Sequence, residues 1–456
     1  MTDLVLRTES RTEVVDRPRR DRSWRIDLAN LVALTGMGLV LGLTGFAAKD
    51  TLAGPGGLAT AVGALLAMAG TYLTLVLLMM ISRLPWLEQA LGHDKMVSWH
   101  RKLAPYSLVL IAAHVAFTVL GYAQRSGVDV WSRFIGLMTT YAWMLPAVVA
   151  FVLMISLGVS SYRRVRSKMK YETWATAHLY FYLAVILSFG HQIESGTMLA
   201  NNPLLKNIWI AFYVLVAIGI AYGRFLQPLR FSTKHRLRVS DVVEETPGTV
   251  SVYLSGRKLD EVRAQGGQFF QWRFLTRNWW WQAHPYSLSA APNGEWLRIT
   301  VKALGDQSRS LATELKVGTR VFAEGPYGVF TAENRKTNRV VAFAAGVGVT
   351  PIRALLEELP KHADTTVIYR VVSADNAPLA EEMQIIAAQR GWTTHVLAGD
   401  PSEHPLTLEH MRQFAPALSQ SDIYVCGPAG FTAGVEALAA TAGVPSERIH
   451  HEAFAF

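Results

Sequence analysis

Six long stretches of the sequence contain no Asp, Glu, Lys or Arg, and they constrain the fold more than any other feature. A helix needs about 20 apolar residues to cross a hydrocarbon core of about 30 Å. Each stretch is close to this length or longer, so we predict a bundle of six transmembrane helices. The stretches are residues 28–48, 51–82, 103–124, 134–162, 173–193 and 207–223.

Charged residues divide the chain into parts. Residues 26–229 hold 21 of the 79 charged side chains, and the other 58 lie outside this range. We therefore expect a tail over residues 1–25, a membrane domain over residues 26–229, and polar domains over residues 230–333 and 334–456.

The distribution of basic residues predicts the orientation in the membrane. Sixteen Lys and Arg residues lie in the tail and in the loops 83–102 and 163–170, against four on the opposite side. Cytoplasmic loops carry the excess of basic residues. No convincing cleavage site for a signal peptide follows the tail. We predict a multi-pass protein of the cell membrane, within the lipid bilayer, with both termini in the cytoplasm.

Composition excludes some functions. The net charge is +9, but residues 230–456 carry 23 acidic and 23 basic side chains. This part has no basic surplus for phosphates, so we predict no nucleic-acid partner. The single cysteine, Cys426, excludes an internal disulfide framework and a four-cysteine iron–sulfur cluster.

Four histidines lie in or at two of the predicted spans, where ionisable residues usually mark a function. His100 and His114 belong to the third span, and His178 and His191 belong to the fifth. These spans run in the same direction, and spacings of 14 and 13 residues correspond to about 21 and 20 Å. Each of two depths therefore offers two imidazoles as ligands of a haem iron. We predict two b-type haems, one on His100 and His178 near the cytoplasm and one on His114 and His191 near the outer face.

The spacing in the fifth span poses a geometric problem. A helix returns to within about 40° of the same face after 14 residues, but misses it by about 140° after 13 residues. We expect either a local distortion of the fifth span or an outer haem approached from another side. Gly190, next to His191, is the candidate position for a distortion.

This histidine pattern resembles the ferric reductase and NADPH oxidase superfamily. The resemblance implies six helices, two haems and a cytoplasmic reductase module that binds FAD and NAD(P)H. It implies that electrons pass from NAD(P)H through FAD and the inner haem to the outer haem, and then to an acceptor outside the cell.

Residues 230–333 alternate short apolar runs with Gly and Pro turns, which predicts a small antiparallel β-barrel. The segment His-Pro-Tyr-Ser at 284–287 resembles the flavin-binding signature of the superfamily, and residues 325–328 (Gly-Pro-Tyr-Gly) resemble its barrel-closing turn. The resemblance implies that a hydroxyl, Ser287 here, bonds the ring near its reactive nitrogen. The implied flavin-binding residues are His284, Pro285, Tyr286 and Ser287 for the ring and ribityl chain, and Lys302 and Ser308 for the phosphates.

Residues 334–456 alternate strands and helices, which predicts a parallel sheet of an α/β domain. Gly346 and Gly348 follow a predicted strand, 340–344, and let the backbone approach a pyrophosphate at a helix N-terminus. We expect Thr350 to be the N-cap and Pro351 to lie in the first turn. The Gly-x-Gly-x-Thr-Pro form resembles nicotinamide domains of ferredoxin reductases.

Three further positions complete the predicted nicotinamide site. Arg370 and Ser373 lie at the end of the second predicted strand, residues 366–371, and could hold the 2′-phosphate of NADPH, although a solvent-facing Arg is the alternative and NADH stays open. Cys426-Gly427-Pro428 resembles the motif beside the nicotinamide ring, while a small buried hydrophobe is the alternative for Cys426. The resemblance also implies that a terminal aromatic, Phe456 or in reserve Phe454, covers the flavin ring.

The electron acceptor stays open between oxygen, which would give superoxide, and ferric iron. Oxidases of the superfamily tend to place an Arg in the second span, but residues 51–82 carry no charge, which weakens a dedicated oxidase. The alternative is an electron-donating membrane partner of an extracytoplasmic redox protein. The predicted outer loops are short, which leaves little surface for such a partner.

Overall fold

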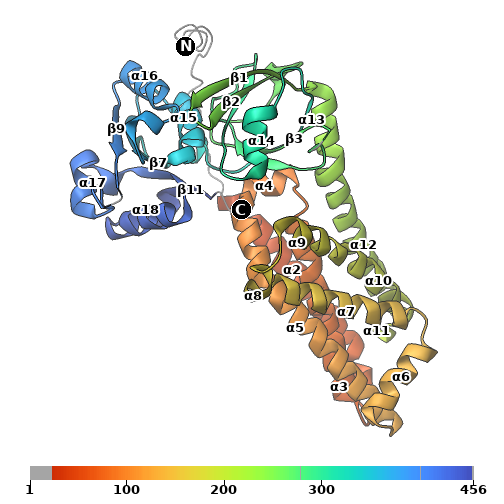
Figure 1. Cartoon of the computed structure of the whole chain (residues 1–456). Helices are drawn as coiled ribbons and strands as arrows, with labels where there is room; N and C mark the ends of the chain where they lie inside the picture. The colour runs from red at the N-terminus through yellow and green to blue at the C-terminus, as the bar shows by residue number, and fades with distance from the viewer. Residues whose placement is uncertain (1–22, 278, 401, 454–456) are drawn as a thin grey trace. The chain divides into compact units, whose positions relative to one another are not determined.

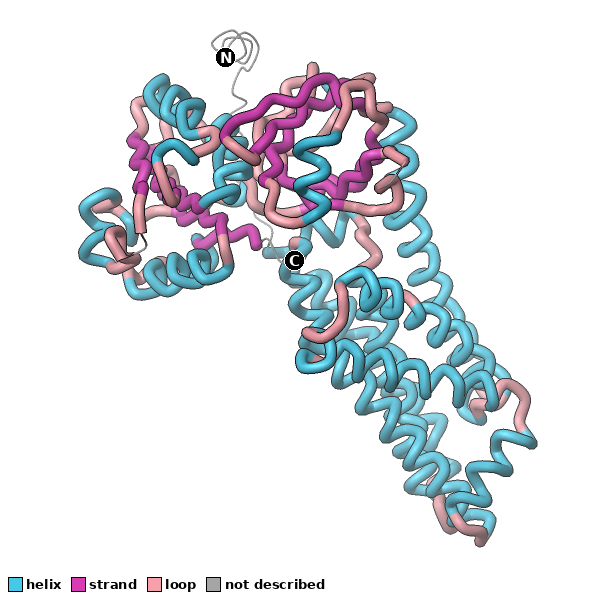
Figure 2. The backbone as a smooth tube through the Cα atoms, in the orientation of Figure 1, coloured by secondary structure: helices cyan, strands magenta, loops and turns pink. Residues whose placement is uncertain are grey.

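A computed structural model describes residues 23–277, 279–400 and 402–453. This part of the chain forms two compact units. The membrane unit comprises residues 24–84 and 95–222, and the C-terminal unit comprises residues 223–453 together with residues 85–94. The regular structure of the membrane unit is helical, whereas all the described strands belong to the C-terminal unit (Figure 1, Figure 2).

The described chain contains six helical segments that are long and apolar enough to cross a membrane. They confirm the prediction of a multi-pass membrane protein. Their elements are α2 (Ser23–Ala48), α3 (Gly57–Met80), α5 (His93–Ser126), α7 (Met144–Ser161), α9 (Tyr171–His178) with α10 (Tyr180–Glu194), and α12 (Pro203–Ala221).

Shorter elements connect these spans. The last segment continues beyond α12 through a π-helical turn, η2 (Tyr222–Leu226), into α13 (Gln227–His235). Helix α13 belongs to the C-terminal unit and packs there on the strand Val321–Tyr327. The other connecting elements are η1 (Lys49–Thr51), α4 (Pro85–Leu91), α6 (Val130–Thr140), α8 (Arg163–Arg166) and α11 (Thr197–Ala200).

Two predicted spans are interrupted. The sequence predicts one span over residues 134–162, but its first part belongs to the separate helix α6, and Trp143 then takes a left-handed φ of 64° before α7 begins. In the fifth span the α-helix is interrupted at Leu179, directly after His178, where i→i+3 hydrogen bonds form while Leu179 keeps a right-handed helical φ of −63°. The prediction that Gly190 permits the distortion is wrong, because Gly190 lies within α10, where a side chain would overlap the ring of Trp143.

Helices α3 and α5 approach each other closely along the part of α5 that carries His100 and His114. Ser107 of α5 donates to the carbonyl oxygen of Gly70 at 3.1 Å and lies 2.6 Å from the hydroxyl of Thr74. A side chain at Gly63 would overlap Thr118 of α5. Small residues allow such close contact between helices in a membrane, and here they bring the backbone of α3 to the side chains of α5.

The first part of the C-terminal unit consists of two three-stranded antiparallel sheets, as expected for a small barrel. One sheet has the order β1-β2-β5 and the other β4-β3-β6. Alternate residues of β3 point inward, so that Phe270, Trp272 and Phe274 are buried in the core between the sheets. The strands are β1 (Arg238–Thr246), β2 (Thr249–Ser255), β3 (Phe269–Phe274), β4 (His284–Ser287), β5 (Leu297–Lys302) and β6 (Val321–Tyr327), with helix α14 (Asp306–Glu314) after β5.

The second part of the C-terminal unit is a five-stranded parallel sheet with the order β11-β10-β7-β8-β9. Successive residues of β7 face opposite sides, so Ala342 packs with one pair of helices and Phe343 with the other. The strand order reverses between β7 and β10, which is where such sheets bind ligands. The elements are β7 (Arg339–Ala345), α15 (Val349–Glu358), β8 (Asp364–Val371), α16 (Ala380–Arg390), β9 (Thr393–Ala398), α17 (Leu408–Phe414), β10 (Asp422–Gly427), α18 (Ala429–Thr441) and β11 (Ile449–Ala453).

Residues 85–94, which precede the third span, belong to the C-terminal unit. The ring of His93 stacks on Tyr327 with centroids 5.8 Å apart and meets the edge of Phe269 at 5.7 Å. Nδ1 of His93 also lies 2.9 Å from a carboxylate oxygen of the buried Glu88. This short segment therefore packs against the end of β3 and β6.

Candidate functional site

The first histidines of the two spans, His100 and His178, lie close together. The ring centroids of His100 on α5 and His178 on α9 are 6.3 Å apart. Two metal–nitrogen bonds of about 2 Å, together with the half-widths of two imidazole rings, add up to about 6 Å. The pair is therefore spaced as two ligands of one metal ion would be.

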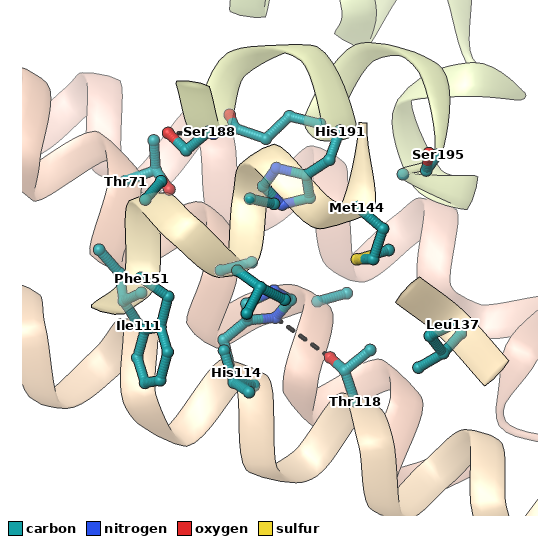
Figure 3. Close-up of a pocket in the computed structure, with 18 of the residues that line it drawn as sticks. Thr71, Ile111, His114, Thr118, Leu137, Met144, Phe151, Ser188, His191 and Ser195 are labelled. Atoms are coloured by element: carbon teal, nitrogen blue, oxygen red, sulfur yellow. Dashed lines mark hydrogen bonds between the residues drawn. The ribbon is translucent and has the colours of Figure 1, made fainter. Parts of the chain in front are cut away.

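The two other histidines line one cavity of the membrane unit. This cavity of about 400 Å³ is bordered by α3, α5, α6, α7 and α10, and its volume is in the range of ligand pockets. The rings of His114 and His191 enter it from α5 and α10 (Figure 3). Its described lining is mostly apolar and contains no Lys, Arg, Asp or Glu.

Hydrogen bonds at Nδ1 orient three of these four imidazoles. Nδ1 of His100 lies 3.2 Å from the carbonyl oxygen of Leu77, and Nδ1 of His114 lies 2.9 Å from that of Gly63. A carbonyl oxygen can only accept, so Nδ1 carries the proton and Nε2 keeps its lone pair. Metal-bound histidines show this arrangement.

His178 reaches the same state through a hydroxyl. Its Nδ1 lies 3.3 Å from Oγ of Ser161, whose own proton is donated to the carbonyl oxygen of Leu157 at 2.9 Å. Oγ also accepts from the indole N–H of Trp174 at 3.1 Å. The hydroxyl therefore accepts from Nδ1 and leaves Nε2 free. The donor set and the spacing of the inner pair fit axial ligation of a haem iron.

The predicted flavin signature lies on β4. Ser287 pairs with Phe269 across the sheet and is 4% exposed, while the His284 and Tyr286 rings stack 6.0 Å apart. Burial raises the pKa of Tyr286 to about 12, so this phenol stays neutral. Pro285 pairs with Gln271 in the same ladder.

The two predicted phosphate-binding residues lie at the end of β5 and the start of α14. Lys302 is the last residue of β5 and is half-buried. The hydroxyl of Ser308 accepts the backbone N–H groups of Leu304 and Gly305 at 3.0 and 2.9 Å. This hydroxyl therefore closes the turn before α14, an arrangement that the motif alone does not predict.

The loop 346–351, which we call the nucleotide loop, needs glycine at two positions for different physical reasons. Gly346 takes a left-handed φ of 55°, whereas a side chain at Gly348 would overlap the backbone of Cys426 in β10. The prediction that Thr350 is the N-cap is wrong, because Gly348 is the N-cap and α15 begins at Val349. Thr350 donates its hydroxyl to the carbonyl oxygen of Val347 at 3.0 Å instead, and Pro351 lies in the first turn as expected.

The structure brings the nucleotide loop and the Cys426 segment together, because β7 and β10 are neighbours. Cys426 and Gly427 end β10, and Pro428 is the N-cap of α18. Arg370 lies near the end of β8, where one guanidinium nitrogen, Nη2, is buried without a hydrogen bond among the described residues. Ser373 is the N-cap of the short helix η6 (Ala374–Asn376). The predicted flavin cover, Phe456 or Phe454, lies outside the described residues.

Sequence motifs do not reveal two acidic residues near Cys426, Glu452 and Asp94, or the Glu88 that acts on Glu452. Glu452 in β11 is 5% exposed, and burial together with Asp94 and Glu88 raises the pKa of its carboxyl well above the usual value. Glu452 pairs with Cys426 across the parallel ladder. No motif marks Glu88 and Asp94 as site residues in the sequence. They lie in the loop 83–102, whose basic residues serve only to predict the orientation in the membrane.

Cys426 is expected to react slowly with alkylating reagents in the folded protein. It is fully buried, and burial followed by Glu452 and Asp94 raises the pKa of its thiol well above the usual value. Because the thiolate is the nucleophile, we expect iodoacetamide at pH 8 to label the native chain at least about 100-fold more slowly than the unfolded chain. Mass spectrometry of the peptide containing this single cysteine measures both rates. Equal rates would contradict the burial of the thiol.

His284 is expected to act as a neutral residue at pH 7. Burial and the nearby charge of Arg273 lower the pKa of its imidazole below 6.5. The folded state therefore resists protonation, and the stability that it contributes is present above pH 6.5 and is lost as the pH falls through the folded pKa. We expect H284N to retain FAD within about 3-fold at pH 7.5 and to lose less thermal stability than the wild type between pH 7 and 5.5. Flavin fluorescence during heating measures this, and an equal loss in both proteins would exclude His284 as the cause.

Three family models match successive parts of the chain. Residues 66–189 match the ferric reductase like transmembrane component, residues 238–331 match an FAD-binding domain, and residues 343–437 match the oxidoreductase NAD-binding domain. These matches make the C-terminal unit an FAD- and NAD(P)H-dependent oxidoreductase module.

Relatives with similar sequences are flavoproteins. A flavohemoprotein of Vibrio cholerae is 35% identical over 180 residues, covering 37% of this chain and 45% of the relative. A flavohemoprotein of Chromobacterium violaceum is 30% identical over 286 residues, covering 56% of this chain and 70% of the relative. The solved flavohem-like FAD/NAD-binding domain of nitric oxide dioxygenase from Vibrio cholerae shares 28% identity with a TM-score of 0.39, covering 48% of this chain and 99% of that domain.

The chain spans about half the length of several of these curated relatives. In this chain a ferric reductase like transmembrane component precedes the FAD- and NAD-binding domains. Since these three families follow one another along a single polypeptide, the chain belongs to the ferric reductase and NADPH oxidase superfamily of membrane flavocytochromes.

Proposed function

We propose that this protein moves electrons across the cell membrane from cytoplasmic NAD(P)H to an acceptor outside. The observation that carries the proposal is the inner pair, His100 and His178, with ring centroids 6.3 Å apart in the same chain as an FAD- and NAD-binding module. When bound, FAD accepts a hydride and releases single electrons, and haem iron relays single electrons. The positive-inside pattern supports placing both termini in the cytoplasm.

The histidines would hold two b-type haems at two depths. His100 and His178 would ligate the inner haem, and His114 and His191 the outer haem. The protonated Nδ1 of His100 and His114, fixed by backbone carbonyls of α3, keeps Nε2 directed to the metal. We call the cavity that His114 and His191 line the outer cavity. Its apolar lining excludes water from the position proposed for the outer haem.

The C-terminal unit would bind the flavin and the nicotinamide within two domains, residues 230–333 and 334–456. Residues 284–287 would contact the flavin ring, Lys302 and Ser308 its phosphates, and the loop 346–351 the nucleotide pyrophosphate. Cys426, Gly427 and Pro428 would lie beside the nicotinamide, and Phe456 would cover the flavin ring.

We propose NADPH as the donor. The 2′-phosphate that distinguishes NADPH needs a cation, and Nη2 of Arg370 is buried without a hydrogen bond among the described residues. Ser373 follows on the same strand end and offers a hydroxyl. An NADH-specific site instead places an acidic residue on the ribose.

We propose oxygen as the acceptor. The described lining of the outer cavity contains no Lys, Arg, Asp or Glu. It therefore offers no counter-charge to an ionic ferric chelate. A small neutral molecule meets no such obstacle. The absence of an Arg in residues 51–82 argues in the other direction, and ferric iron is therefore the competing acceptor that the experiment tests.

The test follows cytochrome c reduction by the haem- and FAD-loaded protein with NADPH in air. If oxygen accepts single electrons, superoxide dismutase is expected to suppress the reduction. If dismutase has no effect while ferric chelates are reduced under argon, the protein is a ferric reductase. If neither acceptor is reduced, an extracytoplasmic redox protein becomes the leading acceptor.

A further inference from the structure

A buried arginine joins the two halves of the C-terminal unit. Arg298 lies on β5 of the barrel and is 2% exposed. A guanidinium group has five N–H donors, and all five are used. They bond Oγ and the carbonyl oxygen of Ser289 at 3.1 and 2.8 Å, the hydroxyl of Tyr253 at 3.2 Å, and both carboxylate oxygens of Glu382 at 2.8 Å each.

Glu382 carries this contact to the nucleotide domain. It lies on α16 and receives the two parallel hydrogen bonds of Arg298, which is the strongest geometry for this pair. Its Oε2 also lies 2.7 Å from Nε of Arg353 on α15. This second contact is an ion pair by distance without hydrogen-bond geometry. One carboxylate thus lies between an arginine of each domain.

A second polar contact between the barrel and the nucleotide domain, which we call the second crossing, lies beside the contact through Glu382. Glu357 of α15 accepts the backbone N–H of Ala291 at 2.6 Å, and its other oxygen lies 2.6 Å from Arg353. Close packing accompanies these polar contacts, because a side chain at Gly266 of the barrel would overlap the backbone of Ala354.

Both crossings start from the segments that would bind the cofactors. Ser289 and Ala291 follow the flavin signature residue Ser287 by two and four residues. Arg353 follows Thr350 of the nucleotide loop by three residues, on the same helix. The network therefore joins the flavin segment to the nucleotide segment through Glu382 and Glu357.

We infer that Glu382 is a positioning residue for hydride transfer, because it fixes the nucleotide helix α15 relative to the flavin strand β4. This inference rests on the proposed function. In the reaction, a carbon–hydrogen bond of the dihydronicotinamide breaks, and the hydride carries two electrons to the flavin, so that the nicotinamide is oxidised and the flavin reduced. A misplacement of about 1 Å between reacting atoms costs as much as about 100-fold in rate.

Stability alone does not account for such a network. A buried ion pair costs about as much in desolvation as it returns, so it contributes little net stability compared with apolar packing. The carboxylate stays ionised: burial opposes this, but Arg353 and Arg298 outweigh burial and lower the pKa of Glu382 to about 2. The network is therefore complete throughout the neutral pH range.

The experiment compares E382Q with E381Q in the full-length protein loaded with haem and FAD. Glu381 is the exposed neighbour on α16 and provides a matched loss of one charge. In anaerobic stopped-flow mixing with NADPH, we expect E382Q to reduce the flavin at least about 10-fold more slowly at saturation, with KM within about 3-fold of the wild type. E381Q is expected to equal the wild type, and the FAD content is expected to be the same in all three proteins.

A second readout does not depend on activity. Without Glu382, Arg353 pairs only with Glu357 and competes with Ala291 for it, so hydrogen exchange of residues 287–291 is expected to rise in E382Q and not in E381Q. Normal flavin reduction by E382Q, or slower reduction with unchanged exchange, would overturn the inference. If E382Q does not fold, E357Q removes the second crossing alone and is expected to slow flavin reduction about 3-fold; no slowing there would equally overturn it.

The two proposals fail in different ways. If NADPH and NADH do not reduce the flavin of the wild type, the proposed function is wrong, whatever the variants do. If the wild type is reduced normally and E382Q is too, only the positioning role is wrong.

Discussion

Replacing His114 by alanine is expected to abolish outward electron transfer while NADPH continues to reduce a soluble dye on the cytoplasmic side. His114 enters the outer cavity from α5, and its Nδ1 is held by the carbonyl oxygen of Gly63 at 2.9 Å. If His114 is a ligand of the proposed outer haem, that haem is lost in the variant, and we expect the haem absorbance per chain to fall by about half. Proteoliposomes with NADPH on one side and cytochrome c on the other measure the transfer.

The control for this variant lies on the same helix. Tyr106 of α5 is 65% exposed and does not border the outer cavity, so Y106L changes α5 without touching the proposed haem site. It is expected to keep both the absorbance and the outward transfer. Outward transfer that survived in H114A with full haem content would exclude His114 as a ligand and the path through it.

Replacing Gly348 by alanine is expected to have the largest effect on the cytoplasmic side. The added methyl group would overlap the carbonyl of Cys426 and the backbone of Gly427, so the start of α15 and the end of β10 must move apart. Both segments are proposed to border the nicotinamide. A displacement of about 1 Å predicts a loss of about 100-fold in kcat/KM for NADPH.

Two other glycines grade this effect. Gly346 has open space around the position of a side chain but a φ of 55°, so G346A is expected to cost about 1 kcal/mol of strain and to reduce activity less. Gly430 in α18 has open space and an ordinary φ, and G430A is expected to behave as the wild type. Steady-state kinetics with a soluble dye measure all three variants. Equal activity of G348A and G430A would mean that the β7–β10 junction does not form the nucleotide site.

The sequence predicted the parts of the fold that periodicity and charge determine. An apolar stretch of this length is stable in a bilayer as a helix, and the described chain forms six helical segments that are long and apolar enough to cross one. The breaks inside spans were not predictable in the same way. Leu179 interrupts an apolar sequence that contains no helix-breaking residue. Pro146, in the first turn of α7, signals a helix start inside the predicted span 134–162, but it does not predict the left-handed φ of Trp143.

The site residues likewise divide into those that a local sequence pattern reveals and those that only the packing of domains brings together. The histidine pairs and the glycine loop are visible as motifs because their spacing along the chain reflects local geometry. Arg298 and Glu382 are separated by 84 residues and resemble ordinary surface charges in the sequence. Their contact depends on how two domains pack. Helix boundaries failed for a smaller reason, since α15 begins one residue before Thr350.

The segment 85–94 has a consequence for the order in which the protein is completed. It is synthesised before the third span, whereas the aromatic residues that its His93 contacts, Phe269 and Tyr327, follow the last span. The C-terminal unit is thus assembled from two pieces of chain made far apart in time. A fragment beginning at residue 223 would lack the His93 ring that contacts Phe269 and Tyr327. A truncated reductase is therefore expected to need these ten residues supplied as a peptide or by fusion.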